Sequence, residues 1–180
     1  MIRKLLAALG IGALLSACAS TPPTIPPVAS VDLPRFMGDW YVIAHIPSYP
    51  ERNAYDAVES YRLDPDGRIR TTFRQRKGGF DAPVETMEPV GRVVPGTSNA
   101  VWEMQFVWPI QAEYVIVDLA PDYSRTIVGR SKRDYVWLMA REARLPAPEL
   151  AAAIEKIRDL GYDTTKLRMV PQSAAGKVSP

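Results

Sequence analysis

From residue 36 onward, the chain alternates between short runs rich in β-branched and aromatic residues and polar turn segments. Several runs alternate hydrophobic and polar positions with a period of two, the pattern of a strand that buries one face. The pattern predicts eight strands, at residues 40–46, 57–63, 68–75, 84–94, 100–107, 112–119, 125–129 and 135–141. Turn signals such as Asp64-Pro65-Asp66-Gly67 favour hairpin-length connections. We therefore expect an antiparallel meander, because a parallel sheet needs a helix between successive strands.

The two faces of the predicted strands differ in chemistry. Arginines occupy one face of the run 68–75 and its extension, and we interpret them as a solvated outer face protected by charge against edge pairing. The alternative is contact with anionic lipid headgroups. These arginines are Arg68, Arg70, Arg74 and Arg76. On inward positions, aromatic residues, Met and Ile are predicted to line an apolar ligand pocket, the alternative being a barrel filled by its own side chains. The predicted lining residues are Phe73, Trp102, Met104, Phe106, Tyr114, Ile116 and Trp137.

One amphipathic helix follows the strands. Pro146 and Pro148 suit its first turn, and Gly161 suits a left-handed C-terminal cap. Its apolar stripe has helical spacing and consists of Leu150, Ala153, Ile154, Ile157 and Leu160. We expect this helix to pack on the outside of the barrel, because it lacks the dense Lys/Arg face of a membrane-surface helix. Residues 167–170 are predicted to form a short strand, and residues 172–180 a flexible tail.

The N-terminal segment has the features of an export signal. Arg3 and Lys4 precede an apolar run at 5–15, which is shorter than the about 20 residues that span a bilayer. Leu15-Ser16-Ala17-Cys18 resembles the lipobox of bacterial lipoproteins, which implies cleavage after residue 17 and acylation of Cys18. The alternative is an ordinary secretory signal. Ala19 after the Cys, rather than Asp, favours the outer membrane by the same resemblance. Residues 18–32 are Pro-rich and are expected to form an extended, unpacked tether.

Composition restricts the chemistry. With one Cys and one His in 180 residues, the chain cannot form an intrachain disulfide, a multi-thiolate site or a His-rich metal site, so we expect neither metal nor cofactor. A net charge of +2 gives no argument for binding nucleic acid. A G-x-S-x-G nucleophile motif and phosphate-binding glycine loops are missing. His45 is expected to face outward, because it is out of phase with Trp40 and Val42. A catalytic pair of carboxylates stays open as a possibility. The sequence gives no specific reason to assign Glu59, Glu85 or Glu88 to such a pair.

Two segments resemble one known family. Gly38-Asp39-Trp40-Tyr41 is similar to the Gly-X-Trp signature of lipocalins, and residues 129–141 are similar to the last barrel strand of bacterial lipocalins and apolipoprotein D relatives. The resemblance covers about residues 33–171. It implies an all-β fold, an eight-stranded antiparallel up-and-down barrel with one C-terminal α-helix packed outside. It also implies structural roles for Gly38, Trp40, Tyr123 and Arg141, with Arg141 packing across Trp40. Ala120 and Val42 depart from the family pattern.

Together these features imply a non-enzymatic binder or carrier of fatty acyl lipids, fatty acids or lysophospholipids. Its expected partners are a lipid ligand and the outer membrane, reached through acylated Cys18, with the barrel facing the periplasm. The apolar tip Trp108-Pro109-Ile110 could contact the membrane or a second subunit, so a homodimer stays open. The alternatives are an enzyme acting on a lipid or small apolar substrate in the same barrel, and a ligand-free envelope interaction protein.

Overall fold

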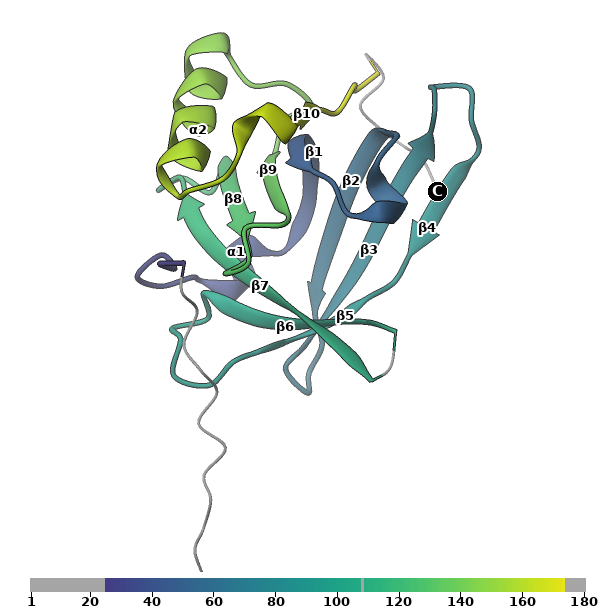
Figure 1. Cartoon of the computed structure of the whole chain (residues 1–180). Helices are drawn as coiled ribbons and strands as arrows, with labels where there is room; N and C mark the ends of the chain where they lie inside the picture. The colour runs from purple at the N-terminus through teal and green to yellow at the C-terminus, as the bar shows by residue number, and fades with distance from the viewer. Residues whose placement is uncertain (1–24, 108, 174–180) are drawn as a thin grey trace, which may run out of the picture.

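The predicted strands form a closed antiparallel barrel (Figure 1). The computed structural model describes residues 25–107 and 109–173. Within them, eight strands form the ring, in the order β1-β2-β3-β5-β6-β7-β8-β9, and β9 pairs back with β1. The ring strands are β1 (Gly38–Ile46), β2 (Ala54–Leu63), β3 (Arg68–Lys77), β5 (Val90–Val93), β6 (Val101–Val107), β7 (Ile110–Leu119), β8 (Arg125–Gly129) and β9 (Val136–Ala140). The expected all-β fold, an eight-stranded barrel with a C-terminal helix, is therefore confirmed.

The run 84–94 was predicted as one strand and forms two, β4 (Val84–Met87) and β5. Glu88 and Pro89 separate them, because Pro89 has no N–H group to donate to a ladder. β4 pairs with the C-terminal half of β3, and β5 pairs with its N-terminal half. Between them, the carbonyl of Pro89 accepts a hydrogen bond from the Thr71 amide at 3.1 Å. The break thus brings residues 87–89 to the edge of the barrel interior.

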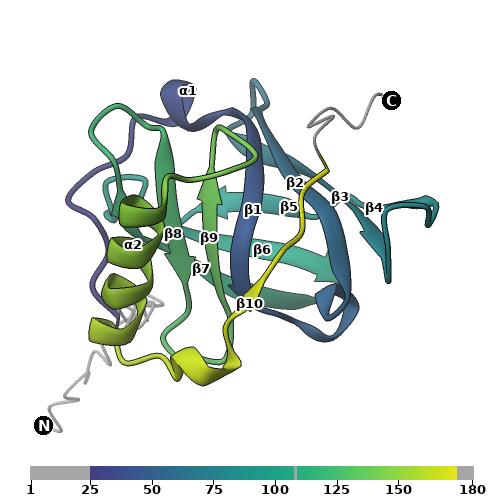
Figure 2. The same ribbon diagram turned by 90° about the horizontal axis from the view of Figure 1, so that it is seen from above.

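Helix α2 (Ala147–Asp159) lies against the outer wall, over β8 and β9 (Figure 2). Ala153, Ile157 and Leu160 are buried against outward-facing residues of the barrel such as Ile127 and Leu138. The expected position of this helix is confirmed. After it, the 3-10 helix η2 (Thr164–Lys166) leads to β10 (Arg168–Met169), the short strand predicted at 167–170. β10 pairs with β1. In the described part of the chain, each helix is too short or too polar to cross a membrane.

The chain before the barrel packs more closely than expected. From Ile25 onward, the Pro-rich segment contacts the barrel, so the expectation of an unpacked tether is wrong for residues 25–32. Ile25 and Val31 are buried, and the amide of Val28 donates to the carbonyl of Ile116 at 2.9 Å. The reason is that its few apolar residues, although scattered among prolines, join the apolar clusters of the barrel: Ile25 packs in the outer cluster and Val31 in the inner one. Residues 18–24, including Cys18, lie outside the described residues.

The C-terminal segment is also held. The side-chain amide of Gln172 donates to the carbonyls of Val42 and Ala57, and the amide of Ser173 donates to Asp56. The tail predicted at 172–180 is therefore attached at its first two residues. The rest of it lies outside the described residues.

A β-bulge in β1 changes which residues face inward. The pairing with β9 shifts register between Val42 and Ala44, and Ile43 and Ala44 both belong to the outer apolar cluster. The residues that follow are therefore one position out of phase with Trp40 and Val42. His45 is fully buried as a result. The prediction that His45 faces outward is wrong, because strict alternation along the strand does not allow for the extra residue.

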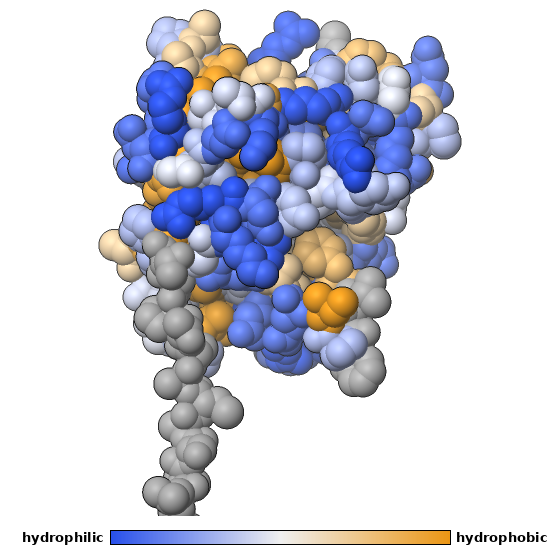
Figure 3. Space-filling model, in the orientation of Figure 1, coloured by the Kyte–Doolittle hydropathy of each residue, from blue (hydrophilic) through white to orange (hydrophobic). Residues whose placement is uncertain are grey.

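The arginines of β3 face outward, as the alternation predicted. Ile69, Thr71, Phe73 and Gln75 between them are buried. Hydrophilic residues cover most of the face of the molecule seen in Figure 3. Each arginine has a carboxylate nearby, and together the arginines form an outer face, as interpreted. The part of the interpretation that invoked protection against edge pairing is wrong, because β3 pairs with β2 on one side and with β4 and β5 on the other. The nitrogen–oxygen distances are 2.5 Å for Arg68–Asp66, 2.7 Å for Arg70–Asp64, 3.8 Å for Arg74–Asp39 and 3.7 Å for Arg76–Asp56.

Candidate ligand-binding cavity

One end of the barrel is closed by a cluster of aromatic side chains, here called the plug. The short helix α1 (Leu33–Phe36) covers this end and inserts Phe36 between Trp40 and Trp102, with ring centroids 5.0 and 5.3 Å apart. Tyr61 packs on the same residues, and its hydroxyl lies 2.5 Å from that of Tyr114. Because these rings fill the cross-section, the barrel interior is open only toward the opposite end.

The signature residues hold the plug in position. The guanidinium carbon of Arg141 lies 3.8 Å from the Trp40 ring centroid, which is the contact that the family resemblance implied. Arg141 also donates hydrogen bonds to the carbonyls of Asp39, Arg35, Phe36 and Met37. These acceptors lie at the end of α1, at Met37 and at the start of β1. The pair is therefore structural, and it closes the barrel where the first and last strands of the ring meet.

Gly38 and Tyr123 complete this end. Gly38 has φ +94°, a conformation that favours glycine, and a Cβ there would lie 3.4 Å from the Arg141 guanidinium. The hydroxyl of Tyr123 accepts a hydrogen bond from the amide of Asp32 at 2.9 Å, and Arg35 stacks on its ring. Both positions therefore connect the segment that precedes β1 to the barrel.

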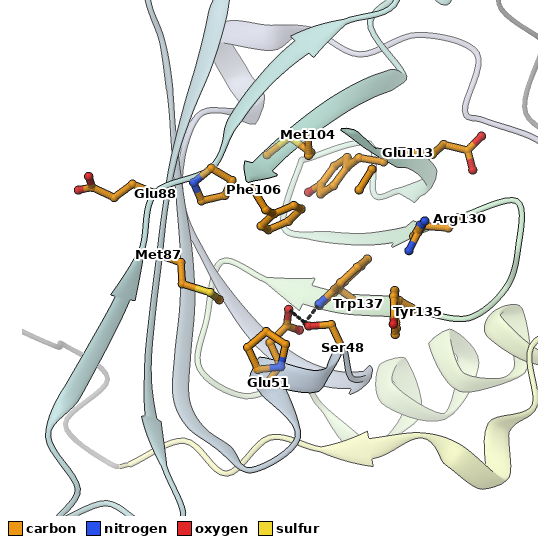
Figure 4. A pocket seen from close by; sticks show the side chains of 14 residues that line it. Ser48, Glu51, Met87, Glu88, Met104, Phe106, Glu113, Arg130, Tyr135 and Trp137 are labelled. Carbon is orange, nitrogen blue, oxygen red and sulfur yellow. Dashed lines mark hydrogen bonds between the residues drawn. The ribbon is translucent and has the colours of Figure 1, made fainter. Parts of the chain in front are cut away.

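Beyond the plug, the barrel contains a cavity of about 560 Å³ (Figure 4). A volume of this size is within the usual range for small-ligand pockets. The opposite end from α1 forms its mouth, where the loops after β1, β4, β6 and β8 meet. The lining residues are Ser48, Pro50, Glu51, Met87, Glu88, Pro89, Met104, Phe106, Ala112, Glu113, Tyr114, Arg130, Tyr135 and Trp137. Apolar and aromatic side chains predominate among them.

Most of the predicted lining residues meet in this cavity. Met104, Phe106, Tyr114 and Trp137 line it, and Phe73 lines a small pocket of about 20 Å³ that extends it toward the plug. Gly91 allows Met104 to enter the interior, because a Cβ at this position would lie 2.6 Å from its sulfur.

Trp102 and Ile116 do not line the cavity, so their predicted role is wrong. Both are fully buried in the core, and Trp102 stacks on Tyr114 with ring centroids 4.9 Å apart. The alternation located these side chains correctly inside the barrel. It could not tell how far along the axis the aromatic plug extends, because that depends on Phe36, which comes from a different element.

Sequence reasoning missed the carboxylate Glu51. It lies in the 3-10 helix η1 (Tyr49–Glu51) between β1 and β2, and it accepts hydrogen bonds from the indole of Trp137 and the hydroxyl of Ser48, each 2.7 Å long (Figure 4). Nδ1 of His45 lies 3.6 Å from the same carboxylate, and neither ring nitrogen of His45 has a hydrogen-bond partner. The spacing Ser48-x-x-Glu51 resembles a capping box and was the available signal.

Glu59 of β2 is a second interior carboxyl. Its strand neighbours in phase, Ala57 and Tyr61, are buried inside the barrel, and Glu59 lines the small inner pocket together with Glu51. Burial raises the pKa of Glu59 to about 8, and the charge of Glu51 adds to the effect. Burial and the charge of Glu59 also raise the pKa of the Tyr114 hydroxyl. The shared face of residues 57, 59 and 61 was visible in the sequence, although it could not be distinguished from a register error.

At the mouth, the cavity is lined by both an acidic and a basic residue, Glu113 and Arg130. Glu113 accepts hydrogen bonds from the amide and hydroxyl of Ser131, at 2.6 and 2.8 Å. Arg130 pairs with Asp134 at 3.2 Å and lies over the ring of Tyr135. Its buried Nε has no hydrogen-bond partner. Arg130 therefore leaves donor capacity beside the cavity mouth.

The described residues contain no group of three or more His, Cys, Asp or Glu side chains arranged to hold a metal ion. The cavity therefore offers an apolar wall, an inner pair of carboxyl groups and a cation at the mouth. Near that mouth, Tyr49 and Ile110 are 76% and 70% exposed, so the rim also presents large apolar side chains to solvent.

Residues 31–172 match the family model described as a lipocalin-like domain. The chain is 30% identical over 157 residues to temperature-induced lipocalin-1 of Arabidopsis thaliana, covering 81% of this chain and 82% of that protein. It is 28% identical over 162 residues to the outer membrane lipoprotein Blc of Vibrio cholerae, covering 88% and 93%. Among solved structures, insecticyanin from the tobacco hornworm Manduca sexta has a TM-score of 0.65 and 20% identity, over 84% of this chain and 86% of insecticyanin. At that identity, the structural likeness is an argument for the fold.

Proposed function

Because the chain belongs to the lipocalin family, whose members typically bind small hydrophobic ligands and are generally not enzymes, we propose that it binds and carries fatty acyl lipids in the cell envelope. Fatty acids and lysophospholipids are the expected ligands. The observation that carries the proposal is the apolar cavity of about 560 Å³, which the aromatic plug closes at one end.

In this proposal the hydrocarbon chain enters from the mouth and lies against Met104, Phe106 and Trp137. Each CH₂ group transferred from water contributes about 0.8 kcal/mol, so ten buried groups contribute roughly 8 kcal/mol before the costs of binding. An anionic headgroup would lie at the mouth beside Arg130, whose Nε is without a partner. Binding then involves no chemical reaction: the hydrocarbon chain of the lipid moves from water into the cavity, where the protein shields it from solvent.

We also propose that Cys18 anchors the protein in the outer membrane with the barrel in the periplasm. The lipobox-like sequence before Cys18 supports this, as does the name outer membrane lipoprotein carried by relatives that match most of the chain. Two or more acyl chains suffice for stable attachment. Labelling of cells with radioactive palmitate tests the anchor. We expect label on the wild type and none on Cys18→Ala; an unlabelled wild type would rule out the anchor.

Extraction and titration test the ligand. Organic extraction of the purified protein, followed by mass spectrometry, should recover an acyl lipid, and dodecanoate should quench the fluorescence of Trp137 in the cavity. Ala112→Phe places a ring in the cavity and should weaken dodecanoate binding at least tenfold, because it removes the volume that the chain occupies. Ala151→Phe, on the exposed side of α2, is the matched control and should bind as the wild type does.

Two outcomes would contradict the proposal. If extraction yields no lipid and dodecanoate causes no quenching, the protein is the ligand-free interaction protein considered as an alternative. The enzymatic alternative requires acidic or basic groups in the cavity, and Glu51 and Glu59 are the residues that it would use. Incubation with a lysophospholipid separates the two cases: a carrier returns the lipid intact, whereas an enzyme releases products.

A further inference from the structure

The inner end of the cavity has a chemistry opposite to that of its mouth. The residues that line the small pocket next to the plug include Glu51, Glu59, Thr71 and Tyr114 among apolar side chains, and they include no Lys, Arg or His. From this arrangement we propose that the pocket is a second polar subsite, which binds the ammonium group of a long-chain primary amine that enters headgroup first. The inference rests on the proposed function, because the cavity must accept the hydrocarbon chain behind the ammonium group.

Thr71 is the independent sign of a missing ligand. It is 3% exposed, is one of the residues that line the inner pocket, and its buried Oγ1 has no hydrogen-bond partner. A buried hydroxyl without a partner costs free energy, on the order of 1–3 kcal/mol. A ligand that donates a hydrogen bond to it would remove this cost.

The size and number of acceptors fit an ammonium group. The inner pocket of about 20 Å³ has room for one group the size of a water molecule. An ammonium group has three N–H donors, and three elements supply an acceptor each: Glu51 from η1, Glu59 from β2 and Thr71 from β3. A carboxylate headgroup would meet two acidic groups and no cation, so a fatty acid must bind in the opposite direction, tail first.

Binding of an ammonium group is expected to be coupled to the loss of one proton from Glu59. Glu51 and the Tyr114 hydroxyl face Glu59, and His45 lies behind Glu51. With a pKa of about 8, Glu59 is about nine-tenths protonated at pH 7 in the empty cavity. An incoming ammonium group stabilises the carboxylate, so Glu59 releases its proton to solvent and an ion pair forms. Amine affinity should therefore rise with pH up to about 8, by as much as tenfold per unit, and then become constant.

Competitive tryptophan-quenching titrations of the full chain with dodecylamine, dodecanol and dodecanoate, each below its micellar concentration, test this inference. Glu59→Gln should weaken dodecylamine binding at least tenfold and change dodecanoate and dodecanol binding less than twofold. Glu103→Gln, an exposed carboxyl on the outer face of β6, is the matched control and should behave as the wild type does. Calorimetry at pH 7 in two buffers of different ionisation enthalpy should find close to one proton released per dodecylamine bound.

The results separate this inference from the proposed function. If dodecanoate binds but dodecylamine does not, or if Glu59→Gln leaves dodecylamine affinity unchanged, the amine subsite is wrong and the carrier function stands. If no ligand binds to the wild type, both fail. If Glu59→Gln does not fold, the wild-type measurement decides alone, because amine binding without proton release overturns the inference.

Discussion

Arg141 shows how much a single side chain contributes at the residue scale. It covers the face of Trp40 and donates to four carbonyls where α1 ends and β1 begins, while it is itself half-buried. Only a planar guanidinium can stack on a ring and reach several acceptors around its edge. The closed end of the barrel therefore depends on an arginine at this position and not on positive charge alone.

Arg141→Lys should lower the free energy of unfolding by about 2–3 kcal/mol, because the ammonium group keeps one or two of these acceptors and loses the stacking. Urea denaturation measures the change. Arg144→Lys, an exposed arginine three residues further on, should change stability by less than about 0.5 kcal/mol. Equal effects for the two variants would contradict the structural role of Arg141.

Glu59 makes the free energy of unfolding depend on pH. Its pKa in the folded protein is about 8, above the ordinary value of 4.5, so the folded state binds more protons between these values. The free energy of unfolding therefore falls as the pH rises from about 4.5 to 8. Glu59→Gln should match the wild type near pH 4.5 and be more stable by roughly 3–5 kcal/mol at pH 8.5. Denaturation at both pH values measures this, and a pH-independent difference would contradict the assignment.

At the scale of elements, helix α2 stabilises the barrel without entering it. Its buried residues contact the outward faces of β8 and β9, and none of its residues is among those that line the cavity. The hydroxyl of Tyr162, just after the helix, accepts from the amide of Arg130 at 2.8 Å and donates to its carbonyl. The helix and the mouth are therefore connected through the loop between β8 and β9.

Ile157→Ala should lower the free energy of unfolding by about 2–4 kcal/mol, because it leaves a cavity between α2 and the wall. Ile154→Ala, at a half-buried position on the same helix, should cost less. Neither substitution should change dodecanoate affinity by more than twofold in titrations at low temperature. A large loss of affinity in Ile157→Ala would mean that α2 controls the cavity.

The whole molecule consists of two apolar layers separated by the barrel wall. The inner layer contains the plug and the cavity, and the outer layer lies under α2 and the N-terminal segment. A cavity of about 560 Å³ means that part of the inner layer is not filled by the protein's own side chains. A ligand that fills it binds only the folded state and so must stabilise the fold.

Dodecanoate at about one hundred times its dissociation constant should therefore stabilise the protein by about 2.7 kcal/mol. For a chain of this size the melting temperature should rise by roughly 5–10 °C. Calorimetric melting of the wild type and of Ala112→Phe measures the effect. The filled-cavity variant should show no rise, and a similar rise in both would mean that the ligand binds outside the barrel.

Much of the fold followed from local pattern. Period-two alternation and turn residues predicted the eight strands, and helical spacing predicted α2, because both patterns depend on neighbours within one element. The resemblance of the segments around Trp40 and Arg141 to lipocalin motifs implied the contact that closes the ring. The cavity-lining positions Met104, Phe106, Tyr114 and Trp137 followed from the inward phase of their strands.

Tertiary structure alone decided the rest. The bulge in β1 turned His45 inward, and Phe36 from α1 filled the end of the barrel, so that Trp102 and Ile116 became core instead of cavity wall. The meeting of Glu51 and Glu59 depends on a loop and a strand that approach each other only when the barrel closes. Sequence determines what each strand can bury, whereas the chemistry of an enclosed space depends on which elements reach into it from different sides.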